Sequence, residues 1–167
     1  MSLQNIAKDY DYTRNTKYST RWSKDDDLSM SVTEESRKAR QAEAPNLADE
    51  YYDLVTPIYE SGWGKHFHYC YFQPGLTLKQ SLKEYELDLA NAIGLKKGMK
   101  VLDVGCGIGE PARTMAREIG CEVVGISINA WHVERGQELT REAGLEDLVT
   151  HVQGDYLVEI AGSLSYV

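Results

Sequence analysis

Glycine is missing from the N-terminal part of the chain, because all 14 glycines lie at or after Gly62. Aliphatic residues are also few before residue 46, and the charged residues there come in clusters such as 24–27 and 34–40. A segment of this composition cannot bury enough apolar surface to offset the entropy lost on ordering. We therefore expect residues 1–45 to form a flexible or loosely helical polar arm. Docking of its aromatic side chains on a partner stays open as an alternative; these are Tyr10, Tyr12, Tyr18 and Trp22.

Positive charge is scarce along the whole chain. Lysine and arginine number 18 against 26 aspartates and glutamates, and the net charge is −8 at pH 7. Binding to nucleic acid requires a basic face that neutralises phosphates, so this balance predicts no nucleic-acid partner. It leaves room for a cationic ligand such as a sulfonium.

Long apolar runs are absent, and cysteines are few. No stretch of 18 apolar residues occurs, and the first residues lack the apolar segment of a secretory signal. We therefore expect a cytoplasmic location, and contact with the surface of the endoplasmic reticulum membrane stays open. The three cysteines, Cys70, Cys106 and Cys121, are an odd number without metal-type pairing, so we expect reduced thiols.

Helical periodicity begins after Asn46, which is a good N-cap residue. The pattern predicts a helix over 47–56 that Pro57 ends. An aromatic, glycine-punctuated loop over 59–74 follows, and then a helix that Thr77 caps and Gly94 ends. Residues 46–97 thus form a helical and aromatic segment that we expect on the substrate side.

Strand and helix patterns alternate after Gly98. Buried strands are predicted over 99–104, 122–126 and 148–153, with helices over 111–119 and 130–143 between them. Strand–helix repeats with short connections are typical of a parallel sheet with right-handed crossovers. Residues 98–167 are therefore predicted to form an α/β, Rossmann-like domain.

A glycine motif follows the first predicted strand: Asp103-Val104-Gly105-Cys106-Gly107-Ile108-Gly109. The dinucleotide fingerprint is G-x-G-x-x-G with an acid about 20 residues later. Here the third glycine comes one residue too early, Glu110 would repel a pyrophosphate, and Ser127 stands where the acid belongs. The alternative without function is a glycine-rich turn that holds no ligand.

The same motif resembles the first motif of the S-adenosylmethionine-dependent methyltransferases, whose cofactor carries an ammonium and a sulfonium and no phosphate. Residues 98–109 and 111–113 resemble the sterol C24-methyltransferases in particular. So do 52–56, 59–64, 67–69, 123–126, Asn129 and 134–136. The resemblance covers about residues 45–156. It implies a class I methyltransferase fold with S-adenosylmethionine as cofactor.

Two departures from that family put the exact substrate in question. Glu110 stands where the family has glycine, and Tyr85-Glu86-Leu87 stands where it has His-Glu-His. The resemblance also ceases after Tyr156, so we expect a fold truncated after its third strand. The family's strand order, 3-2-1-4-5, would then leave the first strand unpaired, which predicts homo-oligomerisation through that sheet edge and little activity in the isolated chain.

The resemblance implies cofactor-binding roles for the glycine turn and the strand ends, namely Asp103, Gly105, Cys106, Gly107, Gly109, Ser127, Asn129 and Asp155. Each polar member has a plain alternative. Asp103 could cap the turn, Asn129 could serve only as a helix N-cap, and Asp155 could be a solvated loop carboxylate.

Aromatic residues gather around the predicted loop: Tyr59, Trp63, Phe67, Tyr69 and Tyr71. Methylation of an alkene leaves a carbocation, which aromatic faces such as that of Tyr59 could stabilise, and Glu60 or His68 could then take a proton. The alternative is a small hydrophobic cluster. We expect no metal, since His66, His68 and Cys70 are only a weak signal, and we expect His132 and His151 to be ordinary surface or helix residues.

The sequence therefore predicts a methyltransferase that uses S-adenosylmethionine and acts on a sterol-like lipid carbon. Two alternatives remain open: a non-catalytic cofactor-binding fragment, and a methyltransferase for another small molecule, such as a tocopherol-like acceptor.

Overall fold

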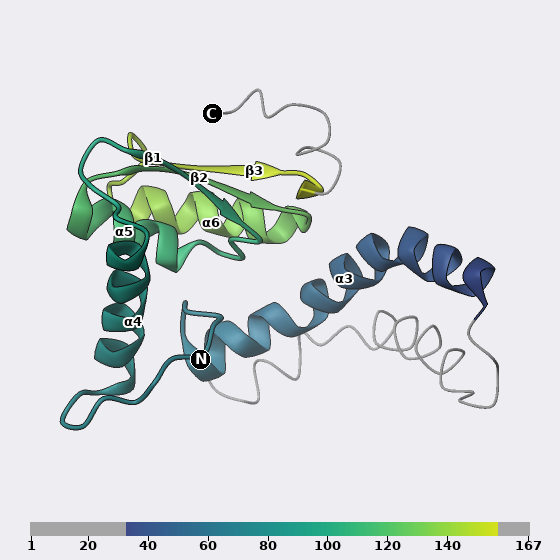
Figure 1. The fold of residues 1–167 in the computed structure, drawn as a ribbon, viewed down its shortest axis with the longest axis horizontal. Coiled ribbons are helices and arrows are strands. Elements are labelled where there is room, and N and C mark those ends of the chain that lie inside the picture. Colours follow the sequence, from purple (N-terminus) through teal and green to yellow (C-terminus); the bar gives the residue numbers. More distant parts are fainter. Residues whose placement is uncertain (1–32, 157–167) are drawn as a thin grey trace. The chain divides into compact units, whose positions relative to one another are not determined.

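A computed structural model of the chain describes residues 33–156. The chain divides into two units, Met1–Gly62 and Trp63–Val167, which are described separately (Figure 1). Among the described helices, none combines the length and the apolar character needed to cross a bilayer. Residues 1–32 of the predicted arm, and 157–167 of the predicted α/β domain, lie outside the described range.

The part of the first unit that the structure describes, from Thr33, is the helix α3 (Glu34–Trp63), whose last residue is the first of the second unit. The prediction of a helix that starts after Asn46 was wrong, because the helix begins twelve residues earlier than Asn46, directly after Thr33. The Thr33 side chain accepts a hydrogen bond from Ser36 N at 3.1 Å, and Glu34 and Glu35 lie in the first turn, where the helix dipole favours acids. The described part of the predicted arm is therefore helical.

Pro57 does not end α3, contrary to the prediction. A proline inside a helix removes one backbone hydrogen bond, and side chains around it supply others. The Thr56 hydroxyl donates to Tyr52 O at 2.5 Å, and the Tyr51 and Tyr59 hydroxyls, on opposite sides of the proline, share a 2.7 Å hydrogen bond. The axis of α3 bends along its length, as expected for a helix that contains two prolines (Figure 1).

The second unit begins with a loop and then follows the predicted order. Its elements are α4 (Leu78–Ala92), β1 (Lys100–Val104), α5 (Glu110–Ile119), β2 (Glu122–Ser127), α6 (Ala130–Glu142) and β3 (Val149–Gln153). Thr77 caps α4 in a capping box with Gln80, as the sequence predicts for its N-terminus. The strands and helices predicted after Gly98 are confirmed to within about two residues.

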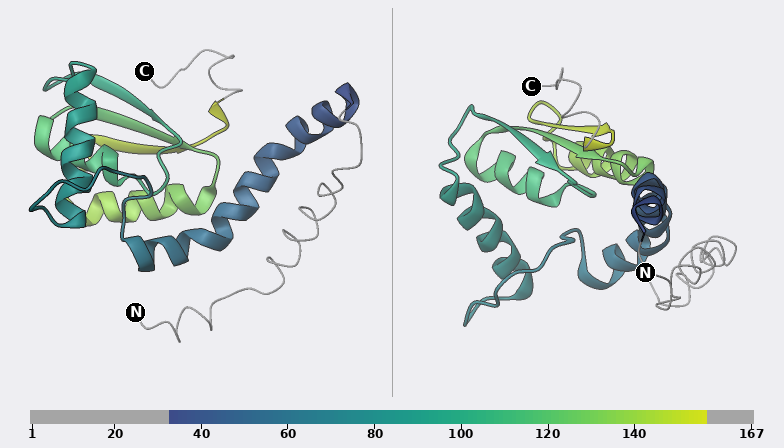
Figure 2. Two further views of the ribbon diagram at one scale, coloured as in Figure 1. Left: turned by 60° about the horizontal axis from the view of Figure 1, so that its bottom comes forward. Right: turned by 45° about the vertical axis from the view of Figure 1, so that its right-hand side comes forward.

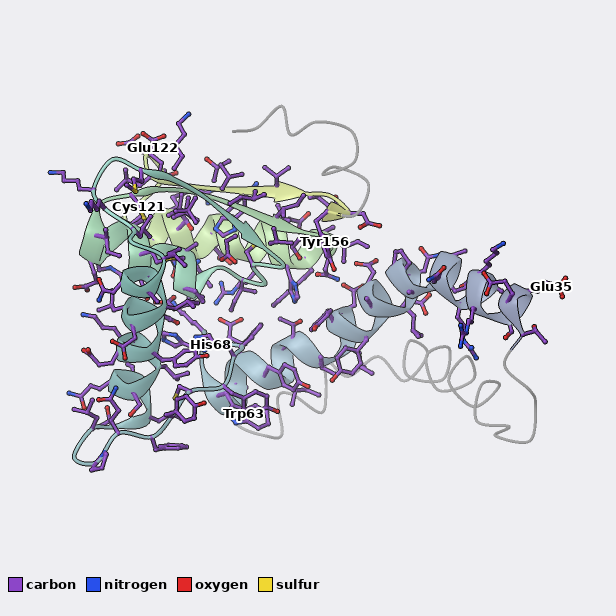
Figure 3. The ribbon with its side chains drawn as sticks, viewed as in Figure 1. Glu35, Trp63, His68, Cys121, Glu122 and Tyr156 are labelled. Carbon is purple, nitrogen blue, oxygen red and sulfur yellow. The ribbon has the colours of Figure 1, made fainter. Side chains whose placement is uncertain are left out.

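The three strands form a parallel sheet in the order β1-β2-β3, with Val101 opposite Val123 and Val123 opposite Val149. Helices α5 and α6 lie on the same face of this sheet (Figure 1, Figure 2). In the described part of the chain β1 pairs with β2 alone, so it is an edge strand there. All three strands end at one edge of the sheet; Tyr156 lies at that edge, and Cys121 and Glu122 lie at the opposite one (Figure 3).

The core lies between the sheet and α5. Its fully buried members are Ala112, Ala116, Cys121, Val123 and Val149, and partly buried side chains such as Val101 and Leu145 pack around them. Ala112 and Ala116, one turn apart on α5, belong to this core, so α5 packs closely against the sheet. The turn from β1 into α5 is thereby held against the sheet.

Candidate functional site

The turn after β1 is built from glycines with left-handed backbones. Gly105, Gly107 and Gly109 have φ angles of 76°, 54° and 77°, which residues with a side chain rarely adopt. The amides of Gly105 and Cys106 both donate to Ile126 O, at 2.9 and 3.1 Å, so the turn is tied to the end of β2. The sequence motif thus corresponds to a fixed turn at the carboxyl edge of the sheet.

A cavity of about 260 Å³ opens beside this turn. It is lined by the turn, by α4 and α5 and by the loop before α4; the lining residues that carry polar or bulky groups are Lys65, Phe67, His68, Tyr85, Glu86, Asp103 and Cys106. Figure 3 shows His68 on the loop that leads to α4. Typical small-molecule sites measure about 300–1,000 Å³, so this cavity suits one end of a nucleoside-sized ligand.

Asp103 presents an unsatisfied anion to this cavity. Its Oδ2 atom is buried and has no hydrogen-bond partner among residues 33–156. Burial raises the pKa of the Asp103 carboxyl, the Glu86 charge raises it further, and His68 partly offsets both. A buried carboxylate oxygen of this kind is stabilised by a cation or a donor from a bound molecule.

Two histidines in the loop before α4 form hydrogen bonds with Glu86. His66 Nδ1 and His68 Nε2 each lie 2.7 Å from Glu86 Oε1. Burial alone would raise the pKa of Glu86, but the hydrogen bonds from His66 and His68 lower it to about 2. Sequence reasoning did not find this cluster, because 18 and 20 residues separate Glu86 from its partners; the retained glutamate between Tyr85 and Leu87 was the available signal.

His151 is also part of the site, although the sequence did not indicate it. The expectation that it is an ordinary surface or helix residue was wrong. It lies on β3, buried under the glycine turn, and Thr140 Oγ1 lies 3.0 Å from its Nε2. A Cβ atom added to Gly109 or Gly136 would come within 2.2 or 2.8 Å of its ring. Two glycines therefore leave the space that this imidazole fills. Burial, helped by the Arg113 charge, lowers its pKa to about 4.

The second and third strand ends carry the remaining cofactor-binding residues expected from the sequence. Ser127 ends β2, and Asn129 caps α6 by accepting a hydrogen bond from His132 N at 2.8 Å. The Ser127 hydroxyl lies 3.2 Å from His132 Nδ1, and Gly154 N donates to Ser127 O, which brings the half-buried Asp155 to the same edge. The N-cap expected at Asn129 is confirmed; contact of these side chains with a cofactor stays a prediction.

The three expected catalytic residues belong to different units. Tyr59 and Glu60 lie on α3, where the Tyr59 hydroxyl is bonded to Tyr51, and His68 lies in the second unit. Their joint action stays a prediction.

Of the aromatic residues in the loop before α4, Phe67 lines the cavity, while Tyr69 and Tyr71 are 96% and 82% exposed. Those two tyrosines do not form the small buried cluster that was the alternative.

Comparison with known proteins identifies the family. The profile of the mycolic acid cyclopropane synthetase family matches residues 38–162. A sterol 24-C-methyltransferase of Gibberella zeae is 44% identical over 125 residues, which are 75% of this chain and 33% of that protein. The chain thus spans about a third of the length of the curated relatives it matches.

Solved structures agree with this result. The [4+2]-cyclase SpnF is 30% identical, with a TM-score of 0.63 over 73% of this chain and 44% of its own. A putative sarcosine dimethylglycine methyltransferase from Galdieria sulphuraria is 26% identical, with a TM-score of 0.54 over 60% of this chain and 41% of its own. The resemblance to the sterol C24-methyltransferases and the expected Rossmann-like fold are confirmed. The chain belongs to the mycolic acid cyclopropane synthetase family, and its second unit carries part of the class I fold of S-adenosylmethionine-dependent methyltransferases.

Proposed function

We propose that the turn after β1 binds S-adenosylmethionine and that this cofactor serves methyl transfer to a sterol-like alkene. The observation that carries the proposal is the buried, unpaired Asp103 Oδ2 beside three left-handed glycines. The cofactor fits this site, because its ammonium group supplies the missing donor for Asp103 and because a Cβ atom at Gly105 would meet nothing within 4 Å. The backbone of the turn is therefore open to a ligand.

Each residue of the site has a separate task in this proposal. Asp103 accepts the ammonium group, and Gly105, Cys106, Gly107 and Gly109 keep the backbone accessible. Ser127 and Asn129 face the ribose, and Asp155 faces the adenine edge. When bound, S-adenosylmethionine supplies an electrophilic methyl group. The protein then mainly holds the acceptor in line and keeps water out.

The substrate class rests on the relatives, which include sterol 24-C-methyltransferases and a cycloartenol-C-24-methyltransferase of rice. The aromatic face of Tyr59 would stabilise the carbocation that alkene methylation leaves, and Glu60 or His68 would hold the proton that is then released. His68 and Glu86 support the acid–base role, because they place polar side chains at a cavity whose lining also includes the apolar Leu89, Ile108 and Met115.

A matched pair of glycine variants tests cofactor binding. Gly105→Ala places a methyl group at the cavity, whereas Gly144→Ala places one in open space at the end of α6; both positions have left-handed backbones, with φ of 76° and 65°. We expect calorimetry to show that Gly105→Ala weakens S-adenosylmethionine binding at least about tenfold, while Gly144→Ala binds like the wild type.

Equal weakening in both variants would mean that backbone strain alone is responsible, and tight binding of NADH would contradict the cofactor. Transfer of a labelled methyl group to sterols with and without a side-chain alkene then tests the substrate. Transfer only to the alkene is expected. Cofactor binding without transfer to any sterol would favour the non-catalytic alternative.

Two surfaces support the proposed contacts with other molecules. Exposed aromatic side chains, Tyr69, Tyr71 and Phe72, suit the polar–apolar boundary of a membrane. The edge of β1 that pairs with no strand among residues 33–156 can template association with a second copy.

Sedimentation distinguishes the two contacts, and each variant is the control for the other. The double variant Tyr69→Ser, Tyr71→Ser should co-sediment less than the wild type with phosphatidylcholine vesicles that contain a sterol. Val104→Lys, at an exposed position on β1, should instead lower the average mass of the protein without lipid. A constant monomer mass at all concentrations, or no binding of the wild type to vesicles, would contradict the respective proposal.

A further inference from the structure

His66, His68 and Glu86 bring three potential metal ligands to one point. The candidate atoms, one from each side chain, lie within 4.8 Å of one another. The side chains are 9%, 26% and 3% exposed, so the cluster is largely removed from water. It lies within the second unit, and it differs from the set suggested by the sequence because Glu86 takes the place of Cys70.

The hydrogen bonds of His68 require a positive charge at its second nitrogen. Its Nδ1 atom lies 3.0 Å from Tyr69 O, and a carbonyl oxygen only accepts, so Nδ1 carries the hydrogen. In a neutral imidazole Nε2 then carries a lone pair, and this pair points at the Glu86 carboxylate 2.7 Å away. A second proton on Nε2 makes this contact an ion pair. A metal cation would take the place of that proton once the two atoms move apart, because the ligands of a tetrahedral zinc ion lie farther from each other than this. Donation of the other ring N–H to a backbone carbonyl is also the usual arrangement of a metal-ligating histidine.

The two oxygens of the Glu86 carboxylate have different surroundings. Glu86 Oε1 contacts both histidines, whereas Oε2 is buried and has no hydrogen bond of normal geometry among the described residues. The nearby Thr114 hydroxyl also helps to lower the pKa of Glu86. Two nitrogens and one carboxylate oxygen thus converge on one point, and such a set of atoms can surround a cation.

The cluster is open on one side. His68 and Glu86 line the cavity next to the glycine turn. Asp103 contributes a second buried carboxylate to the same cavity, and Lys65 is the one lysine in its lining. Zinc sites that bind ligands combine three protein groups, such as two histidines and one glutamate, with a fourth position open to water or another oxygen.

We propose that His66, His68 and Glu86 bind a divalent transition-metal cation of the zinc type, with its open position toward the cavity. The histidine nitrogens and the carboxylate oxygen are the ligands, and Tyr69 O orients His68 from behind. This site does not depend on the proposed cofactor. A bound cation would prevent His68 from taking a proton. Of the two predicted proton acceptors, Glu60 and His68, only Glu60 would then be available.

Zinc binding to the full chain tests the proposal directly. The protein is first stripped with a chelator and then titrated with Zn²⁺ against a chromophoric competitor, and separately with Co²⁺. We expect one Zn²⁺ per chain at micromolar or lower concentration and the intense visible absorption of four-coordinate Co²⁺. His66→Ala and Glu86→Gln should each weaken binding about 100-fold.

Two variants serve as controls. Glu84→Gln removes an exposed carboxylate from the same helix, and Cys70→Ser removes the thiol that the sequence suggested; neither should change zinc affinity. Circular dichroism verifies that each variant is folded, and if Glu86→Gln is not, His66→Ala and the wild-type Co²⁺ spectrum decide. Absence of stoichiometric zinc in the wild type, unchanged affinity in the folded ligand variants, or loss of affinity in Cys70→Ser would each overturn the proposal.

Discussion

Gly109→Ala is expected to lower the free energy of unfolding of the second unit by about 3 kcal/mol. Two effects add at this position. The backbone has φ of 77°, where a side chain costs about 1–2 kcal/mol, and the new Cβ atom would lie 2.2 Å from His151 Cε1. Overpacking of this kind costs about 1–3 kcal/mol when the neighbour cannot move, and the His151 ring is held by Thr140.

Two further variants separate these effects. Gly144→Ala has a similar left-handed backbone but meets nothing within 4 Å, so it should lose only about 1 kcal/mol. In a chain that already carries His151→Ala, the penalty of Gly109→Ala should fall to that of Gly144→Ala. Urea unfolding followed by circular dichroism measures all four. Additive losses from Gly109→Ala and His151→Ala would contradict the close packing of the turn on this histidine.

Acidification from pH 7 to pH 5 is expected to cost about 2 kcal/mol of unfolding free energy through His151 alone. Its pKa is lowered from 6.5 to about 4 by burial and by the Arg113 charge. Below pH 6.5 the unfolded chain takes up a proton on this residue while the folded chain does not. Stability is therefore lost as the pH falls from about 6.5 to about 4, and it is unaffected above that window.

Two of the other groups with shifted pKa values, His68 and Glu86, act in different directions or pH ranges. The pKa of His68 is raised, chiefly by its hydrogen bond to Glu86, so its contribution is complete below pH 6.5 and is lost as the pH rises through the folded pKa. The pKa of Glu86 is lowered from 4.5 to about 2, so its contribution is lost mainly below pH 4.5. Between pH 6.5 and pH 5, His151 is therefore the group among these three whose protonation opposes folding.

His151→Gln provides the measurement, since an amide does not titrate and can still bond to Thr140. The free energy of unfolding obtained from urea titrations should fall between pH 7 and pH 5 by about 2 kcal/mol less in this variant than in the wild type. If both proteins lose the same stability over this interval, His151 is not held neutral in the folded chain.

Local patterns were sufficient to predict the α/β part of the chain. The first strand was expected over 99–104 and lies at Lys100–Val104, and the caps at Thr77 and Asn129 are present. Buried strands, caps and glycine turns depend on neighbouring residues, so their signals are complete within a short window. The glycine turn of the candidate site was predictable for the same reason.

The missed features depend on residues that are distant in sequence or on weak local terms. His151 is buried because glycines in the turn before α5 and on α6 leave space for it, and no window around residue 151 contains that information. The His66–His68–Glu86 cluster joins a loop to a helix across about 20 residues. The length of α3 was underestimated because its first turns lack an apolar stripe, and because the side chains that compensate for Pro57 lie on both sides of it.

Cys106 shows how the site keeps a nucleophile unreactive. Its thiol lines the cavity, and burial, together with the nearby Asp103 charge, raises its pKa to about 12. At neutral pH only about one thiol in 100,000 is then ionised, and the thiolate is the form that attacks an alkyl donor. A protein that holds an activated methyl group beside an ordinary cysteine would slowly alkylate itself. In the proposed function, the Asp103 carboxylate that accepts the donor's ammonium group adds to the burial that protects the chain from becoming its own substrate.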